Sequence, residues 1–280
     1  MSHRHLAASG LRYGYERGVE VLRGADLDVP PGSRVALLGA NGSGKSTLLQ
    51  CLAGTLRPDA GEISLDTQPI DRSRRGLRAH RQAVQLVFQD PDDQLFSADV
   101  AEDVAYGPIN LGLSATEVRE RVDRALELLH ITELRDRPTH QLSFGQRKRV
   151  AIAGAVAMRP CVLLLDEPTA GIDPAGIDAL FATLAELERA GTTVALSTHD
   201  TALALEWADS VAVMTGGVTH QGRPSIMFSD SELLHEARLK APWLTTLTRD
   251  LVLDGILPPG FEPTTPEQLR AALTANRVMP

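Results

Sequence analysis

Cysteine is scarce in this sequence of 280 residues, and long apolar runs are missing from it. Its two cysteines, Cys51 and Cys161, each lie inside a short apolar stretch. The sequence therefore predicts no disulfide framework, and it favours a reducing, intracellular compartment. No apolar run approaches the ~20 residues that cross a bilayer, and the first residues lack the apolar stretch of a signal peptide. We expect a protein that is soluble or bound at the surface of a membrane.

Aromatic residues and positive charge are also in short supply. Aromatic residues make up 4% of the chain, so the core must consist mainly of Ala, Val, Leu and Ile. The formal net charge is −8, whereas a protein that binds nucleic acid non-specifically usually has a basic surface. The composition thus argues against DNA or RNA as the main partner. We interpret the basic stretch at residues 71–82 as the solvated face of a helix.

A glycine-rich loop is the most informative feature that is present. The stretch GANGSGKST matches the pattern G-x-x-x-x-G-K-[ST] at Gly39, Gly44, Lys45 and Ser46. In such a loop the glycines let backbone N–H groups surround phosphate oxygens, the lysine reaches the β- and γ-phosphates, and the serine hydroxyl ligates Mg²⁺. RVALLG before the loop reads as a buried strand and KSTLLQCLAG as a helix, whose N-terminus attracts anions. The predicted nucleotide-binding residues are Gly39, Asn41, Gly42, Ser43, Gly44, Lys45, Ser46 and Thr47.

Short strands and helices alternate along most of the chain. Residues 11–40 contain apolar runs separated by turns, a pattern typical of antiparallel strands. After residue 161, strands alternate with helices, and this alternation indicates a parallel sheet with both faces covered. We therefore predict an α/β protein in which a parallel sheet is joined by an antiparallel edge β-subdomain.

Two further segments extend this core. Helices predicted at about residues 90–160 form an inserted helical subdomain, and one of them, at residues 114–131, combines a capping box with an apolar stripe. Past about residue 222 the chain is rich in proline and only weakly periodic. We predict a main domain over residues 1–222 and a small C-terminal appendage over residues 223–280.

Five further short motifs follow the loop in order. They are VFQDPDDQLF with Gln89, LSFGQRKRVAIA from Leu142, VLLLDEP with Asp166 and Glu167, AGIDP from Ala170, and LSTHD with His199. Each motif is short, but the ordered set is specific. Together with the loop, it resembles the nucleotide-binding domains of ABC-type ATPases over roughly residues 5–222. The resemblance implies a P-loop NTPase core and an enzyme that hydrolyses ATP to ADP and phosphate.

Two acidic residues follow the apolar strand VLLL. Asp166 is placed at the carboxyl edge of the sheet, where ligands bind in open α/β folds, and a carboxylate there can hold Mg²⁺ through its waters. Neighbouring strand residues point in opposite directions, so we expect Glu167 to be aimed away from Asp166. From that position Glu167 could accept a proton from the attacking water.

Three more residues complete the predicted ATP site. Gln89 supplies an amide that can contact water or Mg²⁺, and His199 can donate to the γ-phosphate from the end of a strand. The family places an aromatic residue that stacks on adenine upstream of the loop, and Tyr15 occupies that place. Tyr13 competes for the same assignment, and either tyrosine could instead belong to the core.

The LSFGQ segment resembles the ABC signature motif, which opens a helix. In this family the corresponding groups, here Ser143, Gly145 and Gln146, bind the γ-phosphate of an ATP that the other subunit holds. The resemblance thus implies a head-to-tail dimer with two ATP molecules at its interface, either with an identical chain or with a paralogue. Phe144 departs from the family pattern, in which glycine is usual, and we expect its bulk to lie near the partner's nucleotide.

A longer stretch is more particular. The segment FQDPDDQLFSADVAEDVAYGPINLGLS, together with GRPSIMFSDSELL in the appendage, resembles ATPases of energy-coupling-factor importers, including those for cobalt and nickel. In that group the residues after the glutamine line a groove for a coupling helix of the membrane subunit, and here Leu95, Phe96 and Val100 would line it. The resemblance implies a peripheral protein at the cytoplasmic face of the cell membrane, bound to an integral membrane subunit.

Other functions are compatible with parts of this pattern. An importer ATPase of another branch, or an energy-coupling-factor ATPase for a vitamin, would share most of the motifs. ABC-type ATPases that act on nucleic acid or ribosomes form a different class. They carry long coiled-coil insertions or two cassettes in one chain, and this sequence has neither.

Overall fold

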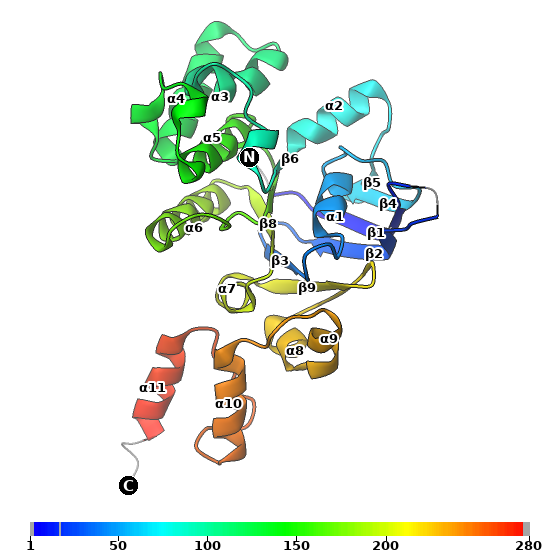
Figure 1. Ribbon diagram of the computed structural model, residues 1–280, viewed down its shortest axis with the longest axis vertical. Coiled ribbons are helices and arrows are strands. Elements are labelled where there is room, and N and C mark those ends of the chain that lie inside the picture. The colour runs from blue at the N-terminus through cyan, green and yellow to red at the C-terminus, as the bar shows by residue number, and fades with distance from the viewer. Residues whose placement is uncertain (1–2, 17, 277–280) are drawn as a thin grey trace.

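The strands of the protein form two sheets (Figure 1). The computed structural model describes residues 3–16 and 18–276. The larger sheet has six strands in the order β10-β9-β3-β8-β7-β6, and the smaller has four in the order β2-β1-β4-β5. The strands are β1 (Leu6–Tyr13), β2 (Leu22–Val29), β3 (Arg34–Leu38), β4 (Ala60–Leu65), β5 (Gln68–Pro69), β6 (Val84–Val87), β7 (Val162–Asp166), β8 (Thr193–Thr198), β9 (Ser210–Thr215) and β10 (Val218–Gly222).

Strand direction separates the two sheets. In the larger sheet β6, β7, β8, β3 and β9 run parallel, and only β10 pairs antiparallel, with β9. In the smaller sheet every pairing is antiparallel. The predicted α/β fold, a parallel core with an antiparallel edge sheet, is therefore confirmed.

Alternate residues of the central strand β3 belong to two different cores. Val35 and Leu37 pack with α1 (Lys45–Leu52) and with the smaller sheet, whereas Ala36 and Leu38 pack with the helices on the other face. Successive side chains of a strand point to opposite faces, so a strand buried on both sides reads as a continuous apolar run. This burial explains why RVALLG precedes the loop, and it places the loop at the carboxyl end of a strand that is packed on both faces.

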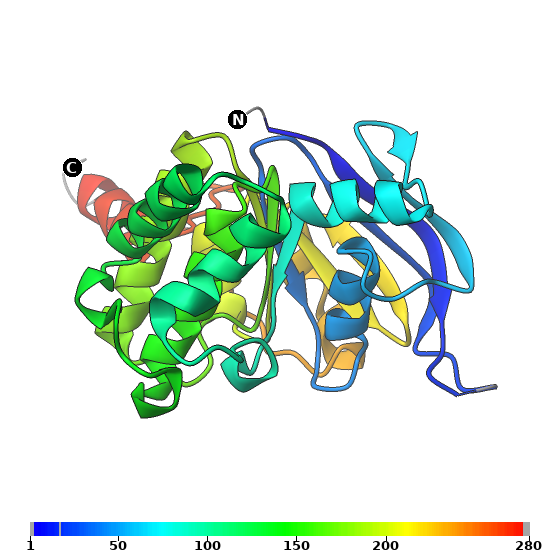
Figure 2. The same ribbon diagram turned by 90° about the horizontal axis from the view of Figure 1, so that it is seen from above.

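Helices cover the larger sheet, and three of them form one side of the molecule. After α1 come α2 (Arg74–Ala83), α3 (Val100–Asn110), α4 (Ala115–Leu128), α5 (Phe144–Ala157), α6 (Pro174–Arg189) and α7 (Thr201–Trp207). Figure 2 shows α3, α4 and α5 on the side of the molecule opposite to the four-stranded sheet. These three helices are the ones expected for an inserted helical subdomain, and the capping box predicted at Ser114 is present.

The described part of the segment after β10 contains four helices, α8 (Pro224–Ser229), α9 (Ser231–Glu236), α10 (Trp243–Leu253) and α11 (Pro266–Asn276). Its weak periodicity did not predict them. Apolar residues of this segment, such as Phe228 and Leu234, belong to the same buried cluster as the helices on the larger sheet. The domain boundary at residue 222 stays a prediction. Within the described residues, none of the helices combines the length and the apolar character needed to cross a membrane.

Candidate active site

The glycine-rich loop joins β3 to α1 at the carboxyl edge of the parallel sheet. Gly44 precedes the helix with φ +111°, and Gly42 has φ +77°, conformations that favour glycine. No side chain caps this helix start, so its first N–H groups are available to a bound anion. A Cβ on Gly39 would lie 2.6 Å from the Ser43 hydroxyl, which is itself buried and has no hydrogen-bond partner within the described chain. Both features suit a loop that closes around phosphate oxygens.

Lys45 turns its ammonium group back into this loop. Its Nζ donates to the carbonyl oxygen of Gly39 at 2.8 Å and lies 3.3 Å from that of Ala40. It also lies 3.4 Å from Glu167 Oε1, and both side chains are only 6% exposed. A phosphate that reached Lys45 would replace a contact with this buried carboxylate.

A cavity of about 360 Å³ opens beside the loop. It brings together Tyr15, the loop, Gln89 and Glu167, which are far apart in the sequence; the lining residues are Tyr15, Val21, Asn41, Gly42, Gly44, Lys45, Ser46, Thr47, Gln89 and Glu167. Val21 is the one lining residue that the sequence analysis did not single out, because an isolated valine carries no recognisable signal. The volume falls within the range of small-molecule sites in proteins.

The two candidate aromatic residues differ in their surroundings. Tyr15 is 61% exposed at the cavity, and its hydroxyl lies 3.2 Å from the Thr47 hydroxyl. The Tyr13 ring packs edge-on against it, with ring centroids 5.1 Å apart, and burial raises the pKa of Tyr13. The geometry favours Tyr15 as the residue that stacks on the adenine ring, and the assignment stays a prediction.

Asp166 and Glu167 are separated by the end of a strand. β7 ends at Asp166, and Glu167 has φ +44°, a left-handed conformation that is uncommon for glutamate. The pleat of the strand therefore does not set the direction of the Glu167 side chain. Alternation of neighbouring strand residues was the wrong basis for predicting that direction. Its carboxylate instead lies between Lys45 and His199, whose Nδ1 is 3.0 Å from Oε2.

Ser197 connects the two acidic residues. Its hydroxyl donates to Asp166 Oδ1 and accepts the N–H of Glu167 at 3.0 Å. The side chain is fully buried in β8. Sequence analysis missed this residue, although a serine inside the apolar strand TVALST is itself a signal, because a buried hydroxyl needs partners.

The oxygen donors around the loop fit a magnesium ion that is bound together with nucleotide phosphates. The predicted ligands, Ser46, Gln89 and Asp166, supply a hydroxyl, an amide and one carboxylate. Among the described residues there is no cluster of three His, Cys, Asp or Glu side chains that would hold a metal by itself. Mg²⁺ characteristically binds through one or two carboxylates, waters and substrate phosphates. Glu167 Oε1, which is buried and has no hydrogen-bond partner in the described chain, faces the same cavity.

The signature residues lie apart from this cavity. Ser143 caps α5, where its hydroxyl accepts the N–H of Gln146 and the Gln146 side chain accepts the N–H of Ser143. Neither residue, nor Gly145, lines the cavity. Phe144 packs against Gly171 of its own chain, since a Cβ on that glycine would lie 2.7 Å from the ring. Its half-buried ring thus contacts an exposed turn of its own chain, and its position relative to a partner's nucleotide stays a prediction.

The segment after Gln89 is attached to α5. Gln94 accepts the N–H of Phe88 at 3.2 Å and donates to the carbonyl of Ala151 at 3.2 Å, while Arg147 forms an ion pair with Asp92 at 2.8 Å. These contacts hold the segment against the signature helix.

An exposed aromatic pair follows this segment. Phe96 is 64% and Tyr106 is 52% exposed, and their rings meet edge-on with centroids 4.6 Å apart. The buried carboxylate of Asp103 accepts the N–H groups of Phe96 and Ser97, each at 2.9 Å, and so fixes the position of Phe96. Val100, which was expected at this surface, is fully buried as the first residue of α3 and cannot line a groove.

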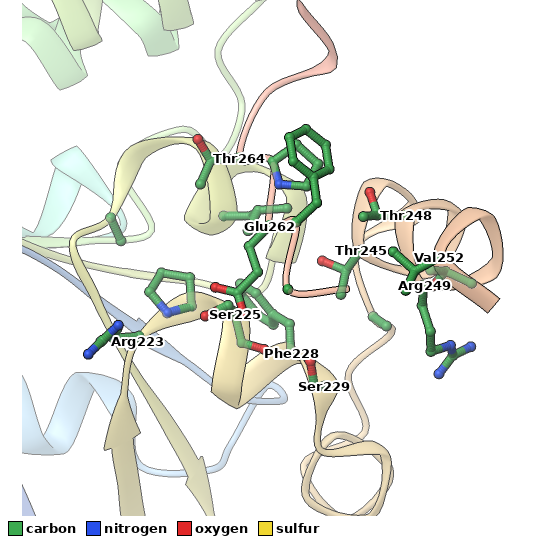
Figure 3. Close-up of a pocket in the computed structure, with 18 of the residues that line it drawn as sticks. Arg223, Ser225, Phe228, Ser229, Thr245, Thr248, Arg249, Val252, Glu262 and Thr264 are labelled. Carbon is green, nitrogen blue, oxygen red and sulfur yellow. Dashed lines mark hydrogen bonds between the residues drawn. The ribbon is translucent and has the colours of Figure 1, made fainter. Parts of the chain in front are cut away.

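A larger cavity, of about 460 Å³, lies between α7 and the C-terminal helices α8 and α10. Figure 3 shows Ser225, Phe228 and Thr245 around it, with the Arg223 and Arg249 side chains at its periphery. Its lining contains none of the residues predicted for ATP, metal or catalysis. Size alone therefore does not identify the active site of this protein.

Known proteins resemble the chain over most of its length. The profile of the ABC transporter family matches residues 22–170. The chain is 52% identical to the cobalt import ATP-binding protein CbiO of Rhodobacter capsulatus, over 86% of this chain and 87% of that protein. It is 45% identical to the energy-coupling factor transporter ATP-binding protein EcfA3 of Clostridium perfringens, over 85% of this chain and 84% of the relative.

Two solved structures are also similar to this chain. CbiO1 of Clostridium perfringens, described as part of the ABC transporter complex cbiONQ, matches with a TM-score of 0.73 and 44% identity, over 87% of this chain and 98% of that one. A dimeric ATP-binding cassette with bound ADP and phosphate matches with a TM-score of 0.71 and 26% identity, over 78% and 98%. The loop, the fold and these similarities agree: the chain is an ATPase of the ABC transporter family, in the group that includes the energy-coupling factor ATP-binding proteins.

Proposed function

We propose that this chain is the ATP-hydrolysing subunit of an importer of the energy-coupling-factor type, with cobalt ions as its cargo. The observation that carries the catalytic part is the cavity in which the loop, Tyr15, Gln89 and Glu167 meet. The cargo is supported by the similarity to the cobalt import protein. Nickel and vitamin import are the alternatives within the same type of transporter.

Each residue predicted for the site has a role in the proposed reaction. The loop amides and Lys45 bind the phosphates of ATP, and Tyr15 stacks on the adenine ring. Glu167 accepts a proton from the attacking water, and His199, hydrogen-bonded to that carboxylate, donates to the γ-phosphate. Mg²⁺, held by Ser46, Gln89 and Asp166, would neutralise negative charge on the phosphates. The positive φ of Glu167 places its carboxylate beside Lys45 and the cavity.

The signature motif is proposed to act on the ATP of a second subunit. Ser143 is exposed at the N-terminus of α5 and lies outside the cavity of its own chain. A helix N-terminus that carries a hydroxyl and N–H groups binds phosphate well. Two chains in head-to-tail arrangement would therefore complete each other's sites.

Complementation between two inactive variants tests this arrangement. A dimer that combines a Ser143→Arg chain with a Lys45→Ala chain keeps one intact composite site, whereas either variant paired with itself keeps none. We expect mixing to restore ATP turnover to as much as half the wild-type rate in the mixed dimers. Because Ser143 is also a helix cap, whose loss costs about 1 kcal/mol, thermal melting of each variant serves as the control. Absence of recovery in mixtures shown to contain the mixed dimer would exclude sites shared between chains.

The exposed pair of Phe96 and Tyr106 is the proposed contact with an integral membrane subunit, at the cytoplasmic face of the membrane. Large apolar side chains held at the surface by a buried carboxylate are typical of interaction sites. Leu95, beside them, is half-buried and packs against the core. Phe96 is therefore the position at which a charge tests binding without disturbing the fold.

Phe96→Asp is expected to weaken co-purification with the membrane subunit by about tenfold or more, because burying a phenylalanine contributes about 1.5–3 kcal/mol. ATP binding by the purified chain should not change. Leu253→Asp is the matched control, since Leu253 is 78% exposed on α10, which lies at the opposite end of the molecule from α3 (Figure 1). Equal loss of binding in both variants would mean that Phe96 is not a specific contact.

Uptake measurements test the cargo. Cells that carry the transporter genes should accumulate radiolabelled Co²⁺ in a manner that depends on Glu167, and unlabelled Co²⁺ should compete better than Ni²⁺. Preferred uptake of Ni²⁺, or of a vitamin in place of either ion, would replace the cobalt assignment and leave the ATPase assignment intact.

A further inference from the structure

Lys148 is a buried cation whose partners are unusual. It lies on the second turn of α5, and its side chain is fully buried. Its Nζ donates to the carbonyl oxygen of Glu167 at 2.6 Å and lies 3.4 Å from that of Ala170. Within the described residues it forms no ion pair with a carboxylate. Burial lowers the pKa of Lys148 to about 8. Lysine is almost never buried in this way unless its ammonium group has a specific use.

The group that Lys148 holds is the backbone of Glu167. Glu167 has φ +44°, and a non-glycine residue keeps such a conformation only where its surroundings hold it. Its carbonyl oxygen accepts from Lys148, and its N–H donates to the Ser197 hydroxyl at 3.0 Å. Both sides of this residue's backbone are thus bonded to buried side chains from other elements.

Phe144, one turn before Lys148 on α5, packs beside the contact between Lys148 and the backbone of Glu167. The centroid of its ring lies 5.7 Å from Lys148 Nζ, and the ring packs against Gly171, which follows Ala170. The first two turns of α5 therefore contact the turn at residues 167–171 at both its ends. This turn begins at Glu167, whose carboxylate faces Lys45 and His199.

We propose that Lys148 is a positioning residue for ATP hydrolysis, which acts through the backbone of Glu167 to keep the carboxylate directed into the cavity. This inference rests on the proposed role of Glu167 as the proton acceptor. Ser143 and Lys148 are on the same helix, so the link also joins the motif proposed to serve a partner's ATP to the carboxylate that serves the chain's own.

The effect of Lys148→Met distinguishes positioning from binding. Methionine fills a similar volume without the charge or the donor groups. We expect turnover to fall about ten- to hundredfold, because even a small displacement of a reacting group lowers the rate by such a factor. The affinity for ATP should stay within about twofold, since Lys148 does not line the cavity. Lys148→Arg, which keeps a cation and its donors, should recover part of the turnover if the site accommodates it, and Lys148→Gln, which keeps donors on a shorter chain, should be intermediate. Arg149→Met, at the next position and without a side-chain hydrogen bond or ion pair in the described structure, should stay within about twofold of wild type.

A double-mutant cycle tests whether Lys148 acts through Glu167. If it does, Lys148→Met should not lower the residual turnover of Glu167→Gln further, because the carboxylate to be positioned is already gone. Single-turnover hydrolysis of radiolabelled ATP measures these low rates, and thermal melting checks folding. Should Lys148→Met fail to fold, Lys148→Gln takes its place in the cycle.

Two results would overturn the proposal. One is a loss from Lys148→Met that is equally large with and without Glu167; the other is a loss of ATP affinity that parallels the loss of turnover. Failure of the proposed function is distinguishable, because Glu167→Gln alone would then keep near-normal turnover.

Discussion

Glu167→Gln is expected to lower ATP turnover by about a hundredfold or more while the protein still binds ATP. The substitution keeps the size of the side chain and removes its capacity to accept a proton. The carboxylate is 6% exposed, lies beside the phosphate loop and is hydrogen-bonded to His199. Loss of its ion pair with Lys45 should not weaken ATP binding, since that ammonium group becomes more available to phosphates. The variant should accumulate as an ATP-bound dimer, which size-exclusion chromatography with and without ATP would detect.

A half-buried glutamate elsewhere in the chain serves as the control. Glu188 lies on α6, outside the cavity, and burial raises the pKa of its carboxyl group. Glu188→Gln should therefore leave turnover close to that of wild type. If the Glu167 variant, purified with its partner subunits, hydrolyses ATP at a near-normal rate, Glu167 is not the proton acceptor.

Lys45→Ala is expected to weaken ATP binding itself, by roughly ten- to hundredfold. A hydrogen bond to a charged group contributes about 1.5–3 kcal/mol, and about 1.4 kcal/mol corresponds to a factor of ten in affinity. The structure adds a second expected effect, because removal of Lys45 leaves the Glu167 carboxylate buried without its cation. The variant should thus be less stable as well as weaker in binding.

The double variant Lys45→Ala/Glu167→Gln separates these two effects. It removes the unpaired charge, so it should recover thermal stability but not ATP affinity, and equilibrium titration with ATP would measure the latter. Recovery of both would mean that the binding defect came from misfolding. Wild-type affinity in Lys45→Ala itself would show that the loop does not bind phosphate in the proposed way.

Local patterns predicted the parts of the site that local sequence determines. The loop requires Gly42 and Gly44 at positive φ, Lys45 follows them directly, and a buried strand precedes them, so the whole unit is contained in one short stretch. The order of strands and helices likewise predicted the parallel sheet. These features depend on neighbours along the chain, and a pattern can show them.

Features that depend on distant contacts were not predictable in this way. The left-handed conformation of Glu167 is held by Ser197 and Lys148, which come from β8 and α5. An apolar residue near the expected groove could be buried, as Val100 is, or exposed, as Phe96 is, and periodicity does not distinguish the two over so short a loop. The C-terminal helices α8 and α9 have six residues each, too few to show a clear helical period, and apolar residues of the segment are buried in the same cluster as the helices on the main sheet.

The attachment of the segment after Gln89 to α5 has a thermodynamic consequence. Gln94 and Arg147 join the surface around Phe96 to the helix that carries Ser143 and Lys148. If ATP changes the affinity of this surface for the proposed membrane subunit, linkage requires that the subunit change the affinity for ATP by the same factor. The membrane subunit would then be driven by ATP hydrolysis and would also regulate the affinity of the ATPase for ATP. Affinities for ATP measured on the isolated chain would therefore differ from those in the assembled transporter by that coupling factor.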